Sequence, residues 1–136
     1  MENRAEARGA GWLAAALLVY ACASLLHFSH NAAFLQDYPD MPAWLTPARV
    51  MAVWAGQTAV GLTGYLVFRR GYRWAGLAMV AVYGVLGLDS LVHYGLAPVS
   101  AHTLAMNLTI WLEAAAAVVV LVAVARLLMM EAGWQR

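Results

Sequence analysis

Four long runs of apolar residues, separated by short polar or glycine-containing segments, dominate the chain. They cover roughly residues 10–30, 48–68, 74–95 and 101–130. A helix needs about 20 apolar residues to cross the hydrocarbon core of a bilayer, and each run is long enough. The pattern therefore predicts an all-α integral membrane protein. We expect an antiparallel, up-down bundle of four transmembrane helices that forms a single domain over residues 1–136.

Composition supports a membrane protein and excludes several functions. Of the 136 residues, 64% are hydrophobic and 11% are charged, whereas soluble domains are about half apolar and one-quarter charged. The single cysteine, Cys22, excludes an intrachain disulfide and a Cys-x-x-Cys site. Because the chain has no lysine, it cannot form a Schiff base with retinal or pyridoxal. A net charge of +1 without a basic cluster indicates no nucleic-acid partner, so the lipid bilayer is the expected environment.

The arginines predict an orientation in the membrane. Positive residues near helix ends are retained on the cytoplasmic side, and only Arg49 lies on the side opposite the others, which are Arg4, Arg8, Arg69, Arg70, Arg73, Arg126 and Arg136. We therefore expect both termini to be cytoplasmic. The alanine-rich, lysine-free composition suggests a bacterial protein of the inner (cytoplasmic) membrane, with the other two connections facing the periplasm.

All four histidines fall at or near the predicted periplasmic ends of the helices, at His27, His30, His93 and His102. Two of them occupy the same place in a repeated phrase, "SLLHFS" around His27 and "SLVHYG" around His93. Helical residues three or four positions apart share a face. This spacing predicts one polar face per helix, and these faces should meet inside the bundle. The aligned positions are Tyr20, Ser24, His27 and Asn31; Gln57; Asp89 and His93; and His102, Met106, Thr109 and Glu113.

Glu113 is the deepest ionisable residue of the predicted bundle. Placing an acidic side chain at the centre of a membrane helix costs about 2.5–3.5 kcal/mol, so such residues are functional by default. We expect the Glu113 carboxyl to bond with Thr109 or Gln57, or to be hydrated in a cavity. It is the candidate for proton transfer.

The histidines and a carboxylate suggest a transition-metal site near the periplasmic ends of the first, third and fourth helices. Imidazole nitrogen and carboxylate oxygen bind Cu, Zn or Fe. The candidate ligands are His27, His30, Asp89, His93 and His102. Asp89 would bind the metal or fix the ring orientation of His93. The supporting residues are Tyr20, Ser24, Asn31, Gln57, Met106, Asn107 and Thr109. Such a site would serve metal handling or redox chemistry.

Other functions fit the same residues. His27 and His93 could be the axial ligands of a b-type haem. Alternatively, Glu113 and the histidines could move protons in an intramembrane enzyme or a lipid-ligand-binding bundle. Ser24, His27 and Asp89, with the two later histidines, also resemble the catalytic set of seven-helix zinc-dependent intramembrane amidases, which implies hydrolysis, although this chain has four spans. The small size also suits a homodimer or a subunit of a larger membrane complex.

Overall fold

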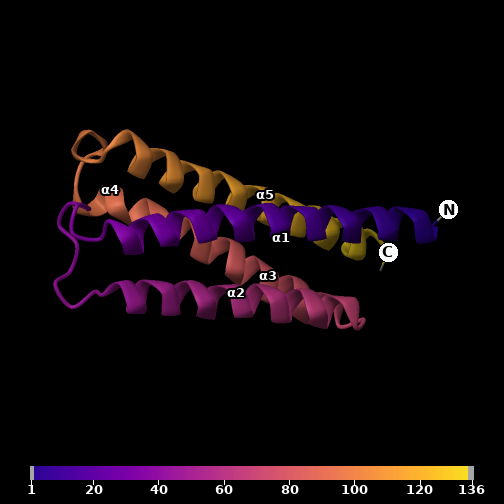
Figure 1. Ribbon diagram of the computed structural model, residues 1–136. Helices are drawn as coiled ribbons and strands as arrows, with labels where there is room; N and C mark the ends of the chain where they lie inside the picture. The colour runs from indigo at the N-terminus through magenta and orange to yellow at the C-terminus, as the bar shows by residue number, and fades with distance from the viewer. Residues whose placement is uncertain (1, 135–136) are drawn as a thin grey trace.

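The computed structural model describes the backbone of residues 2–134 and the side chains of residues 9–133, and the regular elements of that part are all helical. The elements in chain order are α1 (Glu2–Ala33), α2 (Pro47–Arg69), α3 (Arg73–Leu86), the 3₁₀ segment η1 (Gly87–Val92), α4 (His93–Leu96), the 3₁₀ turn η2 (Val99–Ala101) and α5 (Leu104–Trp134). Figure 1 shows these helices running back and forth, with both termini at one end.

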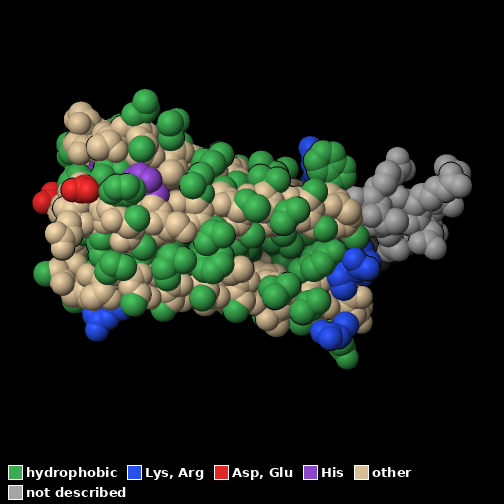
Figure 2. Space-filling view, in the orientation of Figure 1, with side chains coloured by type: hydrophobic (Ala, Val, Ile, Leu, Met, Phe, Trp, Pro, Cys, Tyr) green, Lys and Arg blue, Asp and Glu red, His purple; other side chains and the backbone are tan. Residues whose placement is uncertain are grey.

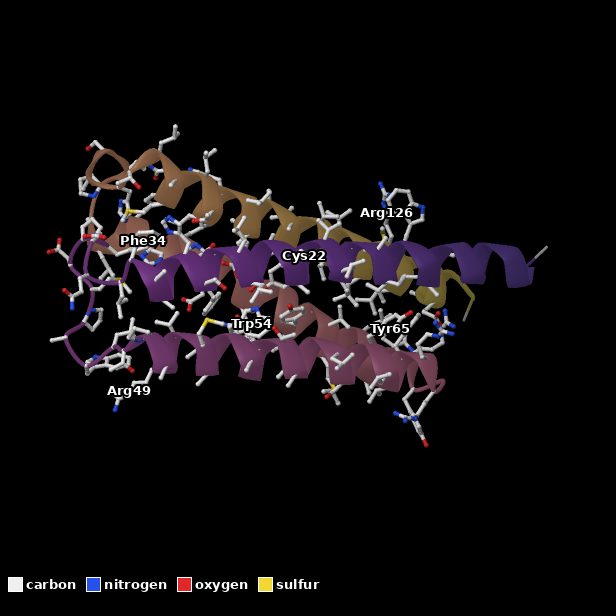
Figure 3. The ribbon with its side chains drawn as sticks, in the orientation of Figure 1. Cys22, Phe34, Arg49, Trp54, Tyr65 and Arg126 are labelled. Atoms are coloured by element: carbon white, nitrogen blue, oxygen red, sulfur yellow. The ribbon has the colours of Figure 1, made fainter. Side chains whose placement is uncertain are left out.

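Four helical stretches are long and apolar enough to cross a membrane: Gly9–Ala33, Pro47–Arg69, Arg73–Leu96 and Leu104–Gly133. The predicted all-helical class and the number of candidate spans are thus confirmed. Figure 2 shows arginine side chains gathered near one end of the molecule and one further patch at the other end, and Figure 3 places Arg126 and Arg49 at these opposite ends. Arg4, Arg8 and Arg136 lie outside the residues whose side chains are described.

The interior changes character along the bundle. Far from the histidines, the core consists of apolar side chains, most of them from α1, α3 and α5, including Leu13, Leu77, Val80, Val120 and Val124; α2 contributes Phe68. Tyr20 and Tyr83 form part of this cluster, with ring centroids 4.4 Å apart, and the Tyr20 hydroxyl donates to the Tyr83 carbonyl at 3.3 Å. We call the other end of the bundle the histidine end. It is the end at which residues 34–46 and 97–103 connect the helices.

Helices α2 and α3 approach closely because glycines line their contact. A Cβ on Gly76 would run into the backbone of Phe68, and one on Gly64 would lie 2.7 Å from the Cβ of Met79. The turn between the helices contains Gly71 with φ of +94°, a conformation that glycine adopts without steric cost. Gly64 therefore serves packing within the chain.

The third and fourth spans differ from the regular helices that the sequence predicted. The third changes to a 3₁₀ segment at Gly87, where the Ser90 hydroxyl donates to the Gly87 carbonyl at 3.1 Å. Helix α5 begins at Leu104, three residues after the predicted start, because the Thr103 hydroxyl accepts the Met106 backbone N–H at 3.3 Å and so caps the helix. His102 consequently lies on the connection before α5 and not on the helix itself.

Candidate functional site

The histidine end holds a group of buried polar side chains from several helices. His27 on α1 lies beside His93 on α4, with ring centroids 5.4 Å apart, and His93 lies 6.1 Å from His102. Each of these three side chains is at most 7% exposed. Other buried polar residues of the bundle are Ser24, Asn31, Gln57, Ser90, Thr109 and Glu113. The structure therefore brings three of the four histidines together in the interior.

Thr109 sets the hydrogen-bonding state of His27. The Thr109 hydroxyl donates to the Met106 carbonyl at 3.0 Å, so its oxygen accepts from His27 Nδ1, which lies 3.3 Å away. A neutral imidazole has one donor and one acceptor nitrogen. His27 Nε2 is consequently the acceptor, and it faces Oε2 of Glu113 at 3.8 Å.

Glu113 is fully buried, and neither of its carboxyl oxygens has a described hydrogen-bond partner of good geometry. The expected partners do not bind it: the Thr109 hydroxyl is directed to the Met106 carbonyl, and Gln57 Oε1 is itself without a partner. Its described ion-pair contact is with His27. Thr109 therefore acts on Glu113 through His27, a relationship that spacing along one helix did not reveal.

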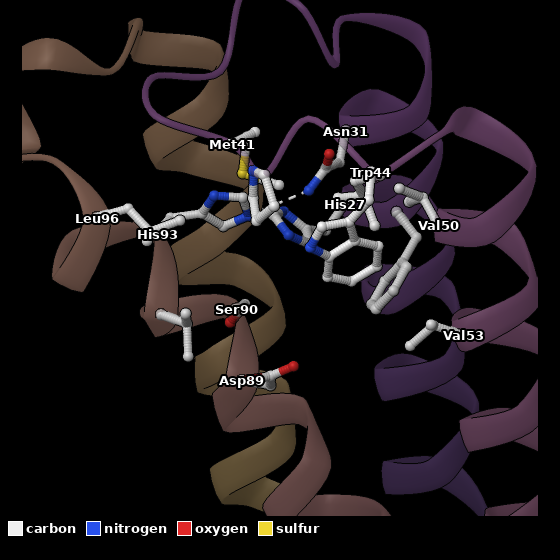
Figure 4. Close-up of a pocket in the computed structure, with 14 residues that line it drawn as sticks. His27, Asn31, Met41, Trp44, Val50, Val53, Asp89, Ser90, His93 and Leu96 are labelled. Carbon is white, nitrogen blue, oxygen red and sulfur yellow. Dashed lines mark hydrogen bonds between the residues drawn. The ribbon is translucent and has the colours of Figure 1, made fainter.

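Asn31 orients His93, the role that the sequence suggested for Asp89. Asn31 Nδ2 donates to His93 Nε2 at 3.1 Å. This leaves Nδ1 as the protonated nitrogen of a neutral ring, and both His93 Nδ1 and Asn31 Oδ1 are buried without described partners. Asp89 lies on η1 with an exposed side chain. In Figure 4 its carboxyl group points away from His93.

The His102 side chain is held by the connection between α4 and α5, on which His102 itself lies. Its Nδ1 donates to the Pro98 carbonyl at 3.0 Å, and its Nε2 is buried with no described partner. Asn107 donates to the carbonyls of Val99 and His102, both at 3.2 Å, and accepts from the Tyr94 hydroxyl at 2.7 Å. Asn107 thus ties the connection to α5. The Met106 sulfur accepts the backbone N–H of Thr103 at 3.4 Å, so Met106 helps to hold the same turn.

Tyr38, in the connection between α1 and α2, is a site residue that sequence reasoning missed. Its hydroxyl lies 2.9 Å from His30 Nδ1, and its ring lies 4.9 Å from that of His93. The side chain is only 3% exposed, and this burial raises the pKa of Tyr38 above its usual value. His30 itself lies outside the three-histidine contact and bonds to the loop. An irregular segment has no periodicity from which the burial of Tyr38 could be inferred.

A half-open cavity of about 380 Å³ adjoins the histidines. Helix α1, the loop before α2, the start of α2 and the η1–α4 segment enclose it (Figure 4). Its polar lining comes from His27, Asn31, Asp89, Ser90 and His93. The remaining lining is apolar or aromatic and comes from Phe28, Met41, Pro42, Trp44, Leu45, Val50, Val53, Val92 and Leu96.

The expected metal and haem sites fit this arrangement unequally. His102 has the arrangement typical of a metal ligand, because its Nδ1 donates to the Pro98 carbonyl and its Nε2 is free. The free nitrogen of His93, by contrast, carries the ring proton. However, no three His, Cys, Asp or Glu side chains within the described part of the chain are grouped to hold a metal ion. A haem with axial His27 and His93 must pass between the two rings, and their edge-to-face contact leaves no slot for the macrocycle.

Comparison with known proteins assigns no family or function to the chain. No protein-family model, curated protein or solved structure matches the sequence. The function is therefore inferred from the residues and geometry of the histidine end.

Proposed function

We propose that this protein is a multi-pass protein of a bacterial inner membrane, with both termini in the cytoplasm. The four candidate spans support insertion. The arginines near the inner ends of the spans support the orientation. In this arrangement the histidine end faces the periplasm. The cavity lies at the level of the outer leaflet, where molecules dissolved in the bilayer can reach it.

We propose that the cavity binds a small, largely apolar molecule by its polar head. The observation that carries this proposal is the combination of apolar walls with two buried polar side chains that have unpartnered atoms, Asn31 and His93. Buried polar groups without partners are costly, by about 1–3 kcal/mol each. A ligand that donates to Asn31 Oδ1, or one that accepts from His93 Nδ1, would remove one of these penalties. Small-molecule sites commonly have this composition.

The function includes a proton step at the same site. His27 lines the cavity and its Nε2 faces the buried carboxyl of Glu113. One proton between these two atoms satisfies both groups without leaving a buried, isolated charge. The pair can therefore hold a proton beside the bound head group and exchange it with that group. Thr109 keeps His27 in the tautomer that this exchange requires.

Filling the cavity tests this function. The full-length protein, purified in a mild detergent, is extracted with organic solvent and the extract is analysed by mass spectrometry. We expect an apolar molecule at roughly one copy per protein, and we expect Val53→Trp to remove it, since Val53 lines the cavity. Val82→Trp is the matched control, because Val82 is similarly exposed, at 52% against 47%, but does not line the cavity. Equal extracts from the two variants would contradict the proposal.

A transition-metal centre is the second candidate. The free Nε2 of His102 and the neighbouring ring of His93, 6.1 Å away, favour it, and metal binding would move the His93 proton from Nδ1 to Nε2. Elemental analysis of the purified protein would then find Cu, Zn or Fe near one atom per chain. A His93→Gln, His102→Gln double variant would lose that metal, whereas His30→Gln would retain it because His30 bonds to Tyr38. Metal below one-tenth of an atom per chain after growth and purification with added metal would reject this candidate.

A further inference from the structure

Asp89 is a carboxylate in an unusual position. It lies within the candidate span Arg73–Leu96, seven residues before its end, which corresponds to about 10 Å along a helix. Its side chain is exposed and lines the apolar cavity. Acidic side chains at this depth are rare and serve ligand or ion recognition by default.

Asp89 has no described cationic partner. Among residues 9–133, the ion pairs with a carboxylate join His27 to Glu113 and Arg73 to Glu131. The cavity lining contains no arginine. Arg49, near the cavity rim, donates to the Trp44 carbonyl at 2.5 Å. The negative charge of Asp89 is therefore available to a molecule in the cavity, and Figure 4 shows its carboxyl group directed across that space toward Val53.

The other cavity groups are also suited to a cation. Asn31 Oδ1 is a second acceptor without a described donor, in a side chain that is 94% buried. Phe28 and Trp44 contribute aromatic rings to the lining. Ring faces attract ammonium groups, with about 0.5–2 kcal/mol per contact. Trp44 already attracts one cation, since the Arg49 guanidinium lies 5.9 Å from its ring centroid.

We infer that the ligand of this cavity is a lipophilic amine that binds in its protonated, cationic form. This inference rests on the proposed ligand-binding function and narrows its substrate class. The ammonium group donates to the Asp89 carboxylate, and the apolar body lies against Val50, Val53 and Leu96. A neutral or anionic head of the same size leaves the charge of Asp89 uncompensated.

Three probes with one apolar body and different heads test the inference: 4-phenylbutylamine, 4-phenylbutanol and 4-phenylbutanoate. Equilibrium dialysis is performed with the full-length protein in lipid nanodiscs, and partition into empty nanodiscs is subtracted. We expect saturable binding of the amine at least ten-fold tighter than that of the alcohol, and no saturable binding of the carboxylate. Asp89→Asn should weaken amine binding about ten-fold and leave alcohol binding unchanged. Asp37→Asn, which removes an exposed loop carboxylate outside the cavity, should change neither.

The outcomes separate this inference from the proposed function. If the amine and the alcohol bind equally and Asp89→Asn changes neither, the cavity binds ligands without selecting cations, and only the inference fails. If Val53→Trp leaves saturable binding of every probe intact, or if no probe binds saturably, the proposed site fails as well. The ranking of the three probes on the unmodified protein decides the matter even if Asp89→Asn does not fold.

Discussion

His27 Nε2 and Glu113 Oε2 lie 3.8 Å apart in the interior of the bundle, with side chains that are 3% and 1% exposed. The two residues come from α1 and α5, and Thr109 on α5 fixes the other nitrogen of the His27 ring. A carboxyl group and an imidazole acceptor at this separation hold a single proton more favourably than two separate buried charges. The pair is thus the centre of the proposed proton chemistry.

Two substitutions of Glu113 should distinguish the effect of its acidic proton from the effect of its side-chain volume. Glu113→Gln keeps the shape and supplies an amide donor for His27 Nε2, so we expect its free energy of unfolding to stay within about 1 kcal/mol of the original. Glu113→Ala leaves a cavity and an unpartnered nitrogen and should cost about 2–4 kcal/mol. Thermal unfolding in detergent measures both. Infrared difference spectra on amine binding should lose the carboxyl signal in Glu113→Gln, and a retained signal would assign it to another acid.

Thr109→Val should disturb His27 without changing the volume of the site. The substitution leaves Nδ1–H of His27 buried without an acceptor, which costs about 1–3 kcal/mol. Thr109→Ser keeps the hydroxyl and should lose far less. Nitrogen-15 NMR of labelled histidine should show the Nδ1-protonated tautomer in the original protein and in Thr109→Ser, and a changed tautomer population in Thr109→Val. Identical spectra for the two variants would show that Thr109 does not set the state of the ring.

The helices were predictable because their length and apolarity are local properties of the sequence. The runs at 48–68 and 74–95 match the candidate spans Pro47–Arg69 and Arg73–Leu96 within one residue at each end. The late start of α5 was not predictable from apolarity, since it depends on the Thr103 cap and on the Asn107 bonds to the preceding connection. The 3₁₀ change at Gly87 likewise depends on how α3 meets its neighbours.

Some residues of the site could be predicted from their spacing along the helices, whereas others could be identified only from the folded structure. The stripe of Tyr20, Ser24, His27 and Asn31 is buried as the helical period predicts. Spacing also placed Asp89 on the face of His93, and both residues line the same cavity, although the Asp89 side chain is exposed and that of His93 is buried. Tyr38 and Trp44 could not be assigned, because their loop has no period and its position depends on contacts with distant helices.

The close approach of α2 and α3 predicts a position-specific effect of adding one methyl group. Gly76→Ala drives a Cβ into the backbone of Phe68, and overpacking of this kind costs about 1–3 kcal/mol. Gly56→Ala is the control, because nothing lies within 4 Å of its added Cβ. It should be neutral or stabilise the helix by up to about 1 kcal/mol. Both are measured by thermal unfolding in detergent, and equal stabilities would contradict the contact.

Because of Tyr38, the stability of the folded protein should fall as the pH rises above about 10. Burial raises the pKa of the Tyr38 phenol above its ordinary value of 10.0, so the folded state holds this proton more tightly than the unfolded state. The resulting stabilisation is complete below about pH 10, the unfolded value, and is lost as pH rises from there through the folded pKa. At pH 8, Tyr38→Phe should cost about 0.5–1.5 kcal/mol through the lost bond to His30.

Above pH 10 the difference in stability between the original protein and Tyr38→Phe should shrink, by at most about 1.4 kcal/mol per pH unit, because only the original protein must release the buried phenol proton. Thermal unfolding from pH 8 to 11 follows this difference. Tyr72→Phe is the control, since the Tyr72 side chain is 69% exposed. A difference that stays constant or grows with pH would mean that Tyr38 is not held in its neutral form by burial among His30, His93 and His102.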